Sequence, residues 1–419
     1  MFIHVYSRVG GEGKESCRTF SEVSVLSLHN VTILYFMRNI PTKNDKQKIS
    51  TGSMRASGLI MMLSLFLLPA ISFIARGEEA AESRFFESWE GWNKKYKGDK
   101  RMPSDWSWGP DVLAGYESRF VDMGEAFDGP VRCCVIRRLN PSKSKKAFLY
   151  VHGFNDYFFQ DEWGKEFVDS GYNFYAVDLR RYGRSRLPWQ YPFNVRDQKE
   201  YFADIDSALN IIRRDGNADI TLGGHSTGGL TVAYYAAYRA DSIGVDRVVT
   251  DSPFLAWNFN AFMRNVAAPT IQGLSKIFPN AVVDQGKCDG YAYSLLKQYD
   301  GEWTYNTDWK MIYSPPVKWS WVGAINGAQK DLMKRKDNIK VPILIMTSSR
   351  KIEGCNYTPE FLTGDAVLDP SMIRERGEQF SNKTVCVIDS GIHDLILSPL
   401  PARKEARDEI FRYIRTHQQ

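Results

Sequence analysis

A seven-residue stretch rich in glycine constrains the fold of this chain more than any other part of its sequence: Gly223-Gly224-His225-Ser226-Thr227-Gly228-Gly229. It lies between an apolar run at 219–222 that is typical of a strand and a run at 230–240 that is typical of a helix. Its middle five residues fit G-x-S-x-G, in which a serine occupies a sharp strand-to-helix turn. Glycines beside such a serine leave space for the following helix. The stretch therefore predicts a strand, a strained turn at Ser226 and a helix.

The sequence around this stretch alternates between strand-like and helix-like segments. Two predicted strands at 116–122 and 131–139 form a hairpin-like start to a sheet. Further strands are expected at 147–151, 172–178, 247–250, 341–347 and 383–388, and further helices at 162–169, 202–214 and 402–417. Such alternation is typical of a mostly parallel sheet with helices on both faces, so we expect the α/β class.

The alternation stops between residues 254 and 338, where aromatic residues are frequent and prolines and glycines separate them. An insertion at this place is expected to form a cap over the carboxyl edge of the sheet, where open α/β sheets bind their ligands. Its aromatic rings either line an apolar pocket for an acyl or other apolar group or form the core of the cap itself. The sequence favours neither interpretation.

The N-terminal part is not like the rest. Residues 1–53 show no periodicity, and we expect them to be unstructured or to be an over-extended gene start. Residues 54–77 begin with Met54-Arg55, continue with an apolar run at 59–75 and end in charged residues, as in a secretory signal peptide. A membrane anchor and a buried helix are the alternatives, since the run is just long enough to span a bilayer. If residues 54–77 are a signal peptide or an anchor, the protein is expected to be exported or membrane-anchored. Without such a signal it is expected to be cytoplasmic.

The expected domain organisation follows from these segments. Residues 78–115 are rich in aromatic residues at helical spacing and predict a helical segment packed on the body. Residues 116–253 and 339–419 are predicted to form the α/β core, and residues 254–338 the cap.

Composition excludes several classes of function. The net charge is only +5, because 54 Lys and Arg residues are scattered among 49 acidic ones, which argues against a nucleic-acid partner. The six cysteines contain no C-x-x-C pair, so we expect no metal, and no phosphate-binding glycine motif indicates a nucleotide cofactor. Cys288 in the cap and Cys355 in the core are a candidate disulfide.

A serine hydroxyl acts as a nucleophile only with a base, usually histidine, which a carboxylate orients. Where a G-x-S-x-G turn carries the nucleophile, the chain order is Ser, acid, His. Of the six histidines, His393 follows the last predicted strand and is the candidate base. Spacing alone does not choose the acid; the candidates are Glu353, Asp365, Asp369 and Asp251.

Five motifs occur in a fixed order: Y-V-H-G-F at 150–154, D-L-R-R-Y-G-R-S at 178–185, G-H-S-T-G-G at 224–229, D-A-V-L-D at 365–369 and G-I-H-D at 391–394. With these motifs, residues 116–416 resemble the α/β-hydrolase superfamily, and within it the branch of serine aminopeptidase S33-like and monoacylglycerol lipase-like (lysophospholipase) proteins. The resemblance implies an α/β-hydrolase fold with an inserted cap.

The resemblance also implies roles for individual residues. The acid is the first aspartate of D-x-x-L-D, Asp365, and Asp369 is a structural carboxylate. Asp251, at the end of the preceding predicted strand, stays the second candidate. The backbone N–H groups of Phe154 and Thr227 form the oxyanion hole. The sequence departs from the family in the long run 348–364 before Asp365.

The function expected from these residues is acyl transfer to water by Ser226, His393 and Asp365, without cofactor or metal. The substrate is expected to be a carboxylic ester of an acyl lipid with a medium or long chain, such as a monoacylglycerol or lysophospholipid. A peptidase or amidase is the alternative, although the segment 153–156 lacks the G-G-P-G of the proline iminopeptidases. A non-catalytic ligand-binding protein on the same fold is the other alternative. The sequence leaves the oligomeric state open.

Overall fold

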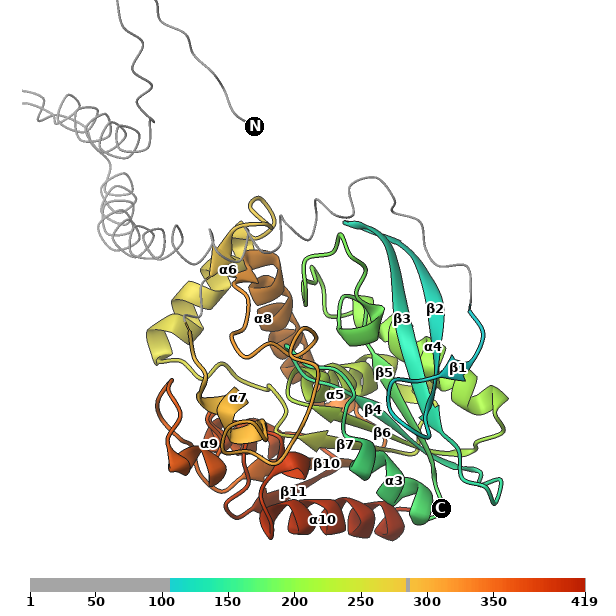
Figure 1. Ribbon diagram of the computed structural model, residues 1–419. Coiled ribbons are helices and arrows are strands. Elements are labelled where there is room, and N and C mark those ends of the chain that lie inside the picture. Colours follow the sequence, from blue (N-terminus) through green and yellow to red (C-terminus); the bar gives the residue numbers. More distant parts are fainter. Residues whose placement is uncertain (1–105, 284–286, 419) are drawn as a thin grey trace, which may run out of the picture. The chain divides into compact units, whose positions relative to one another are not determined.

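A nine-stranded sheet, in the order β1-β2-β3-β5-β4-β6-β7-β10-β11, forms the centre of the computed structural model, which describes residues 106–283 and 287–418 (Figure 1). Strands β3, β5, β4, β6, β7, β10 and β11 form its main body. The strands are Gly109–Pro110 (β1), Glu117–Ala126 (β2), Gly129–Arg138 (β3), Lys146–Val151 (β4), Asn173–Asp178 (β5), Asp219–His225 (β6), Arg247–Asp251 (β7), Ile343–Ser348 (β10) and Lys383–Ile388 (β11).

The strand directions confirm the predicted α/β class. Strand β3 pairs antiparallel with both β2 and β5, whereas all pairs from β5 to β11 are parallel. The register pairs Val151 with Gly224 and His225 with Asp251. The loops that follow β4, β6 and β7 therefore meet at one edge of the sheet, as the carboxyl ends of neighbouring parallel strands must.

Helices cover both faces of the sheet (Figure 1). Helices α3 (Asp161–Asp169) and α10 (Ala402–Thr416) pack on one face, where their apolar residues form one core. Helices α4 (Glu200–Arg214) and α5 (Thr227–Arg239) pack on the other. The predicted apolar stripe of α4 is buried, because Ile205, Leu209 and Ile212 have no exposed area. Full burial of such a side chain contributes about 1.5–3 kcal/mol.

A buried carboxylate at the end of β5 ties two loops of the carboxyl edge together. Asp178 accepts hydrogen bonds from the backbone N–H of Phe158 at 2.9 Å and of Arg184 at 3.0 Å. The Arg184 guanidinium also pairs with Asp178 at 2.9 Å and with Asp111 at 2.7 Å. Both Asp178 and Arg184 are buried, so the D-L-R-R-Y-G-R-S motif holds the loop after β4 in place.

The cap segment, residues 254–338, contains α6 (Ala268–Leu274), α7 (Gly290–Leu295), α8 (Trp319–Lys334) and the short strands β8 (Val282–Val283) and β9 (Val317–Lys318). Helix α8 packs against α5 and α6. The cap also contacts the loop after β4: the Asn155 amide donates to the carbonyl of Met311 at 2.7 Å, and the N–H of Asn306 donates to the Tyr157 hydroxyl at 2.8 Å. These bonds hold the cap segment on the carboxyl edge.

Among the element boundaries that differ from the predictions, those of β6 and α5 lie beside Ser226. Strand β6 extends to His225 and α5 begins at Thr227, so Gly228 and Gly229 are helical and Ser226 alone forms the turn. Helix α9 (Pro370–Gly377) was not predicted; the Asp369 carboxylate caps it by accepting from the N–H of Ser371. The short length of α9 gives it little periodicity in the sequence.

Several predictions concern the N-terminal part. The expected segments at 1–53 and 54–77, and the helix expected within 78–115, fall on residues before 106, outside the described part. Within the described ranges, no helix combines the length and the apolar character that crossing a bilayer requires.

Candidate active site

The turn at Ser226 has the strained geometry that the sequence predicted. Its φ of 53° and ψ of −116° are unfavourable for a residue with a side chain. Hydrogen bonds hold the turn on both sides: the N–H of Ser226 donates to the carbonyl of Asp251, and the N–H of Phe254 donates to the carbonyl of Ser226, each at 2.9 Å. The strain is thus stabilised by the neighbouring strand β7.

Two glycines allow this turn to pack closely. A Cβ atom at Gly224 would lie 2.5 Å from the carbonyl oxygen of Gly228, and one at Gly228 would lie 2.3 Å from that of His152. Backbone atoms cannot move aside as a flexible side chain can. The glycines of G-x-S-x-G are therefore required by the contact between β6, α5 and the loop after β4.

Ser226, His393 and Asp365 form one chain of hydrogen bonds. Nδ1 of His393 donates to Oδ2 of Asp365 at 2.9 Å, and the Ser226 hydroxyl donates to Nε2 of His393 at 3.0 Å. With the proton on Nδ1, Nε2 is free to accept from the serine. The exposed fractions of Ser226, His393 and Asp365 are 7%, 3% and 0%, so water competes little for these bonds. The structure thus brings together the three residues that the sequence selected.

Strand β10 ends at Ser348, and residues 349–364 form an excursion from the sheet. The chain then returns, and Asp365 pairs with Lys351 close to the carboxyl end of β10. Its Oδ1 accepts from the N–H groups of Val367 at 2.8 Å and Leu368 at 2.7 Å. These bonds leave Oδ2 to face His393. The carboxylate is therefore oriented by its own loop.

The other candidate acids lie elsewhere. Asp251 accepts from the N–H of Leu395 at 3.1 Å and faces His225 instead of His393. Glu353 is exposed and pairs with Lys351, and Asp369 caps α9. Among the four candidates, only Asp365 is hydrogen-bonded to His393.

The backbone N–H groups of Phe154 and Thr227 are the predicted donors for an oxyanion. Phe154 belongs to the loop after β4, which lies close to the serine, since a Cβ atom at Gly153 would be 3.2 Å from Cβ of Ser226. Within the described ranges, no acceptor takes a hydrogen bond from either N–H. Both groups are thus available to a ligand beside Ser226.

His152, which precedes this loop, has a structural role. Its Nδ1 donates to the carbonyl of Gly153 at 2.8 Å, and its Nε2 accepts from the N–H of Leu179 at 3.0 Å. Burial lowers the pKa of His152, in agreement with a neutral ring that both donates and accepts. The ring therefore shapes the loop and does not face the serine.

A cavity of about 290 Å³ opens beside Ser226 and His393. Its apolar lining comes from the loop after β4, the cap and the 349–367 segment, and includes Phe154, Met311, Ile312, Phe361 and Val367. Its polar lining includes Asn155, Tyr291, Tyr305, Lys310 and Ser314. The cap aromatics thus serve both purposes considered from the sequence, because some line this cavity and others pack inside the cap.

Sequence reasoning missed the cation in this cavity. Nζ of Lys310 lies 2.9 Å from Oδ1 of Asp156, and both side chains are buried. Although burial opposes ionisation, Lys310 holds the pKa of Asp156 below its usual value. The rings of Tyr291 and Tyr305 lie 5.6 and 5.8 Å from the ammonium. A lone lysine in an aromatic stretch gives no signal of such a pairing.

The structure contains the candidate disulfide between Cys288 and Cys355. It joins the cap, just before α7, to the excursion that precedes Asp365, and both cysteines line the cavity. The N–H of Gly290 donates to the carbonyl of Cys355 at 3.0 Å beside the bridge. The bridge therefore fixes one wall of the cavity.

Replacing both Cys288 and Cys355 by serine is expected to destabilise the protein by up to about 4 kcal/mol, because the bridge closes a loop of 67 residues and restricts the unfolded chain. Denaturant unfolding of the two forms measures the difference. Cys386→Ser is the matched control, since Cys386 is a free, half-buried cysteine. An equal loss of stability in the control and the double variant would contradict the expectation.

A family model described as serine aminopeptidase, S33, matches residues 142–399, which include every residue of the site described above. This match covers more than half of the sequence. The chain belongs to the serine aminopeptidase S33 family. The resemblance inferred from the five motifs is confirmed, and this S33 protein is a hydrolase by family.

Solved structures share the fold of this S33 protein. Monoacylglycerol lipase from Paleococcus ferrophilus is 19% identical over 72% of this chain and 99% of its own, with a TM-score of 0.50. A soluble variant of monoglyceride lipase from Saccharomyces cerevisiae is 14% identical over 76% and 97%, with a TM-score of 0.51. A carboxyl esterase from Bacillus coagulans is 12% identical over 71% and 98%, with a TM-score of 0.50.

At these identities the likeness establishes the α/β-hydrolase fold and nothing finer. A search of curated proteins gave no significant match to the sequence.

Proposed function

We propose that the protein hydrolyses carboxylic esters through an acyl-enzyme on Ser226. The observation that carries this proposal is the chain of hydrogen bonds from Ser226 through His393 to Asp365, next to a cavity. A nucleophile bonded to a base, which a third group orients, is the arrangement that nucleophilic catalysis requires.

In the first half of the proposed reaction, the Ser226 hydroxyl attacks the ester carbonyl and passes its proton to Nε2 of His393. Asp365 keeps the ring in the required tautomer and stabilises the imidazolium. The N–H groups of Phe154 and Thr227 donate to the oxygen that becomes negative in the tetrahedral intermediate. His393 then gives the proton to the departing alcohol, and an acyl ester of Ser226 remains.

In the second half, water takes the place of the alcohol. His393 accepts a proton from the water as its oxygen attacks the acyl carbonyl, and the same two N–H groups stabilise the second intermediate. The Ser226 oxygen departs and regains its proton from His393. The products are a carboxylic acid and the alcohol, and the site returns to its initial state.

The cavity supports an ester of an acyl lipid, with a monoacylglycerol or lysophospholipid as the type of substrate. Apolar side chains from the cap and from the 349–367 segment can surround an acyl chain, while Asn155, Tyr305 and Lys310 offer hydrogen bonds to a polar alcohol part. Its volume of about 290 Å³ lies at the lower end of the range for ligand pockets, roughly 300–1,000 Å³. We therefore propose acyl chains of short to medium length.

Aminopeptidase activity, which the family description suggests, fits the cavity less well. An aminopeptidase binds the positively charged amino terminus of its substrate, for which a carboxylate is the natural partner. The residues that line the described cavity include no aspartate or glutamate that could pair with an amino terminus. Asp156 is already paired with Lys310. This lining favours an acyl ester over a substrate with a charged amino terminus.

Labelling with a fluorophosphonate and an ester panel test the proposal. We expect Ser226 to be the labelled residue, because only an activated serine reacts with the probe, and peptide mapping identifies it. With p-nitrophenyl esters from acetyl to palmitoyl, kcat/KM is expected to peak at a short or medium acyl chain, because the cavity is too small to enclose a longer chain. An amino-acid p-nitroanilide is the peptidase control.

The outcomes separate the alternatives. Folded protein that neither labels nor hydrolyses any ester would contradict the proposal and favour a ligand-binding role. A higher kcat/KM for the p-nitroanilide than for every ester would favour the aminopeptidase.

A further inference from the structure

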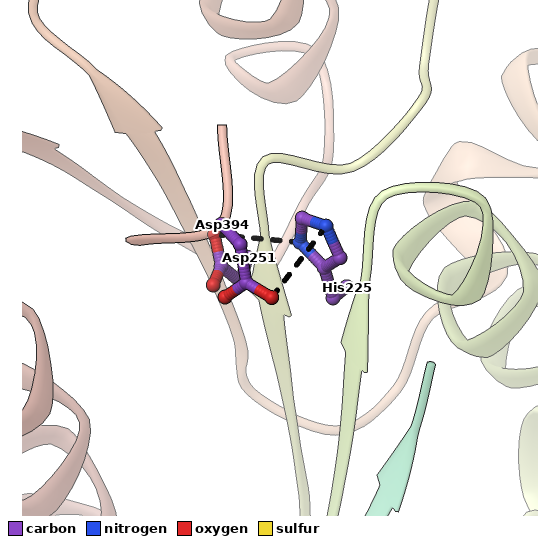
Figure 2. A group of neighbouring side chains, drawn as sticks. All are labelled: His225, Asp251 and Asp394. Atoms are coloured by element: carbon purple, nitrogen blue, oxygen red, sulfur yellow. Dashed lines mark ion pairs between the residues drawn. The ribbon is translucent and has the colours of Figure 1, made fainter. Parts of the chain in front are cut away.

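A second group of ionisable side chains lies beside the Ser226 and His393 pair. His225, Asp251 and Asp394 surround one point, and the two carboxylates approach opposite nitrogens of the ring (Figure 2). Nδ1 of His225 is 3.8 Å from Oδ1 of Asp251, and Nε2 is 3.9 Å from Oδ2 of Asp394. The three side chains are 3%, 7% and 0% exposed, so the group is almost entirely buried, although His225 also lines the cavity beside Ser226.

Each member of this group is directly connected to the proposed machinery. His225 precedes Ser226 in the chain, and Asp394 follows His393. Asp251 accepts from the N–H of Ser226 through its carbonyl, and from the N–H of Leu395 through its carboxylate. The group therefore links the turn that carries the serine to the loop that carries the histidine.

The surroundings of the Asp394 carboxylate indicate the protonation state of this group. Within the described ranges, neither of its oxygens has a hydrogen-bond partner, and Nδ1 of His225 has none. An ionised carboxylate without a partner is costly in the interior, and it requires a nearby positive charge or a proton. A doubly protonated ring at His225 provides one N–H toward each carboxylate.

The charges of the group agree with this interpretation. Burial alone would lower the pKa of His225, but Asp394 and Asp251 raise it to about 9. Burial raises the pKa of Asp394 to about 7, against the attraction of His225. Both carboxylates thus favour the protonated form of the His225 ring.

We propose that His225, as an imidazolium held between Asp251 and Asp394, is a positioning residue that sets the distance between Ser226 and His393. The inference rests on the proposed hydrolase function. The rings of His225 and His393 lie 4.8 Å apart, near enough for a shift of one to displace the other. Because a misplacement of about 1 Å can cost about 100-fold in rate, such a clamp has a large effect without touching the substrate.

Other titratable groups face this cluster from neighbouring elements. Asp156 in the loop after β4 is paired with Lys310 of the cap, so this pair is neutral as a unit. His393 and the hydroxyls of Tyr150 and Tyr291 complete the surroundings; burial raises the pKa of both tyrosines well above the usual value, so they stay neutral. Of the positive charges near Asp394, His225 lowers its pKa more than Lys310 does.

The pH dependence has a definite sign. A histidine whose pKa is raised by folding stabilises the fold fully below its unfolded pKa of about 6.5, and this stabilisation is lost as the pH rises through the folded pKa of about 9. Above about pH 9 the ring is neutral, and no positive charge then lies between the two carboxylates. We expect kcat to fall there while KM changes little.

The decisive experiment follows the imidazole and the catalysis separately in the full chain. ¹⁵N NMR of histidine-labelled protein is expected to show His225 doubly protonated at pH 7 and titrating near 9. In His225→Gln we expect kcat to fall by about 100-fold and the alkaline decline to disappear, while KM stays the same. Asp219→Asn, which removes an ion pair with Arg247 at the opposite end of β6, is the control and keeps the alkaline decline.

The double variant His225→Gln with Asp394→Asn addresses folding. If His225→Gln is unstable because it leaves buried carboxylates unpaired, removal of one charge is expected to restore the thermal stability but not kcat. Recovery of kcat together with stability would show that His225 only supports the fold, and would overturn the proposal.

Two further results would also overturn it. One is a neutral His225 at pH 7; the other is stoichiometric metal in the purified protein whose removal by a chelator abolishes activity. The NMR titration needs no turnover, so a protein with a protonated His225 but no hydrolysis would contradict the proposed function and not the charge of the cluster.

Discussion

Replacement of Ser226 by alanine is expected to lower kcat for ester hydrolysis by about 10⁴-fold to 10⁶-fold while the protein stays folded. The alanine removes the oxygen that would attack the carbonyl and take the acyl group. The N–H groups of Phe154 and Thr227 remain, and they are expected to support only a residual rate. Fluorophosphonate labelling is expected to be lost together with the activity.

A suitable control is Ser390→Ala. Ser390 also has a positive φ, of 55°, and lies only three residues before His393, but its hydroxyl approaches Asp389 at 3.4 Å and not the base. Its substitution is expected to leave kcat near the wild-type value. If Ser226→Ala retained the activity of the control, with equal thermal stability, the acyl-enzyme on Ser226 would be wrong.

Replacement of Asp365 by asparagine is expected to lower kcat by about 10⁴-fold. The amide oxygen can still accept from the N–H groups of Val367 and Leu368. Its NH₂ group then faces Nδ1 of His393, which can no longer donate. The proton moves to Nε2, and the ring cannot accept the proton of Ser226. The fold is expected to stay intact, so near-ultraviolet circular dichroism should not change.

Two aspartates allow this prediction to be tested against its alternatives. Asp369→Asn keeps a good cap on α9, because asparagine and aspartate are about equally favoured there, and is expected to change kcat little. Asp251→Asn removes a carboxylate from the His225 cluster and is expected to lower kcat less than Asp365→Asn. A larger loss in Asp251→Asn would identify Asp251 as the acid that serves His393.

The parts of the fold that could be predicted from the sequence are those with a local cause. The strands β4 and β10 contain continuous apolar runs, and the turn at Ser226 is encoded by adjacent glycines. The base could be found by elimination, because few histidines follow the serine. The start of α5 was predicted three residues late, because Gly228 and Gly229 are poor helix formers that close packing nonetheless requires in the first turn.

The parts that could not be predicted depend on contacts between distant segments. Asp365 was chosen by resemblance, since its orientation comes from N–H groups of its own loop and its neighbour His393 is 28 residues away. The pairing of Asp156 with Lys310 spans 154 residues. The surroundings of His225 could not be predicted either, because Asp251 ends β7 and Asp394 follows β11.

The disulfide between Cys288 and Cys355 limits how the cap can move. It fastens the start of α7 to the segment that leads into Asp365. If this corner of the cap moved away from the core, it would displace the Asp365 loop that orients His393, and the site would lose its geometry. The covalent link therefore restricts movement of the cap at this corner. The cavity wall that contains Cys288 and Cys355 is thus tied to the segment that carries Asp365.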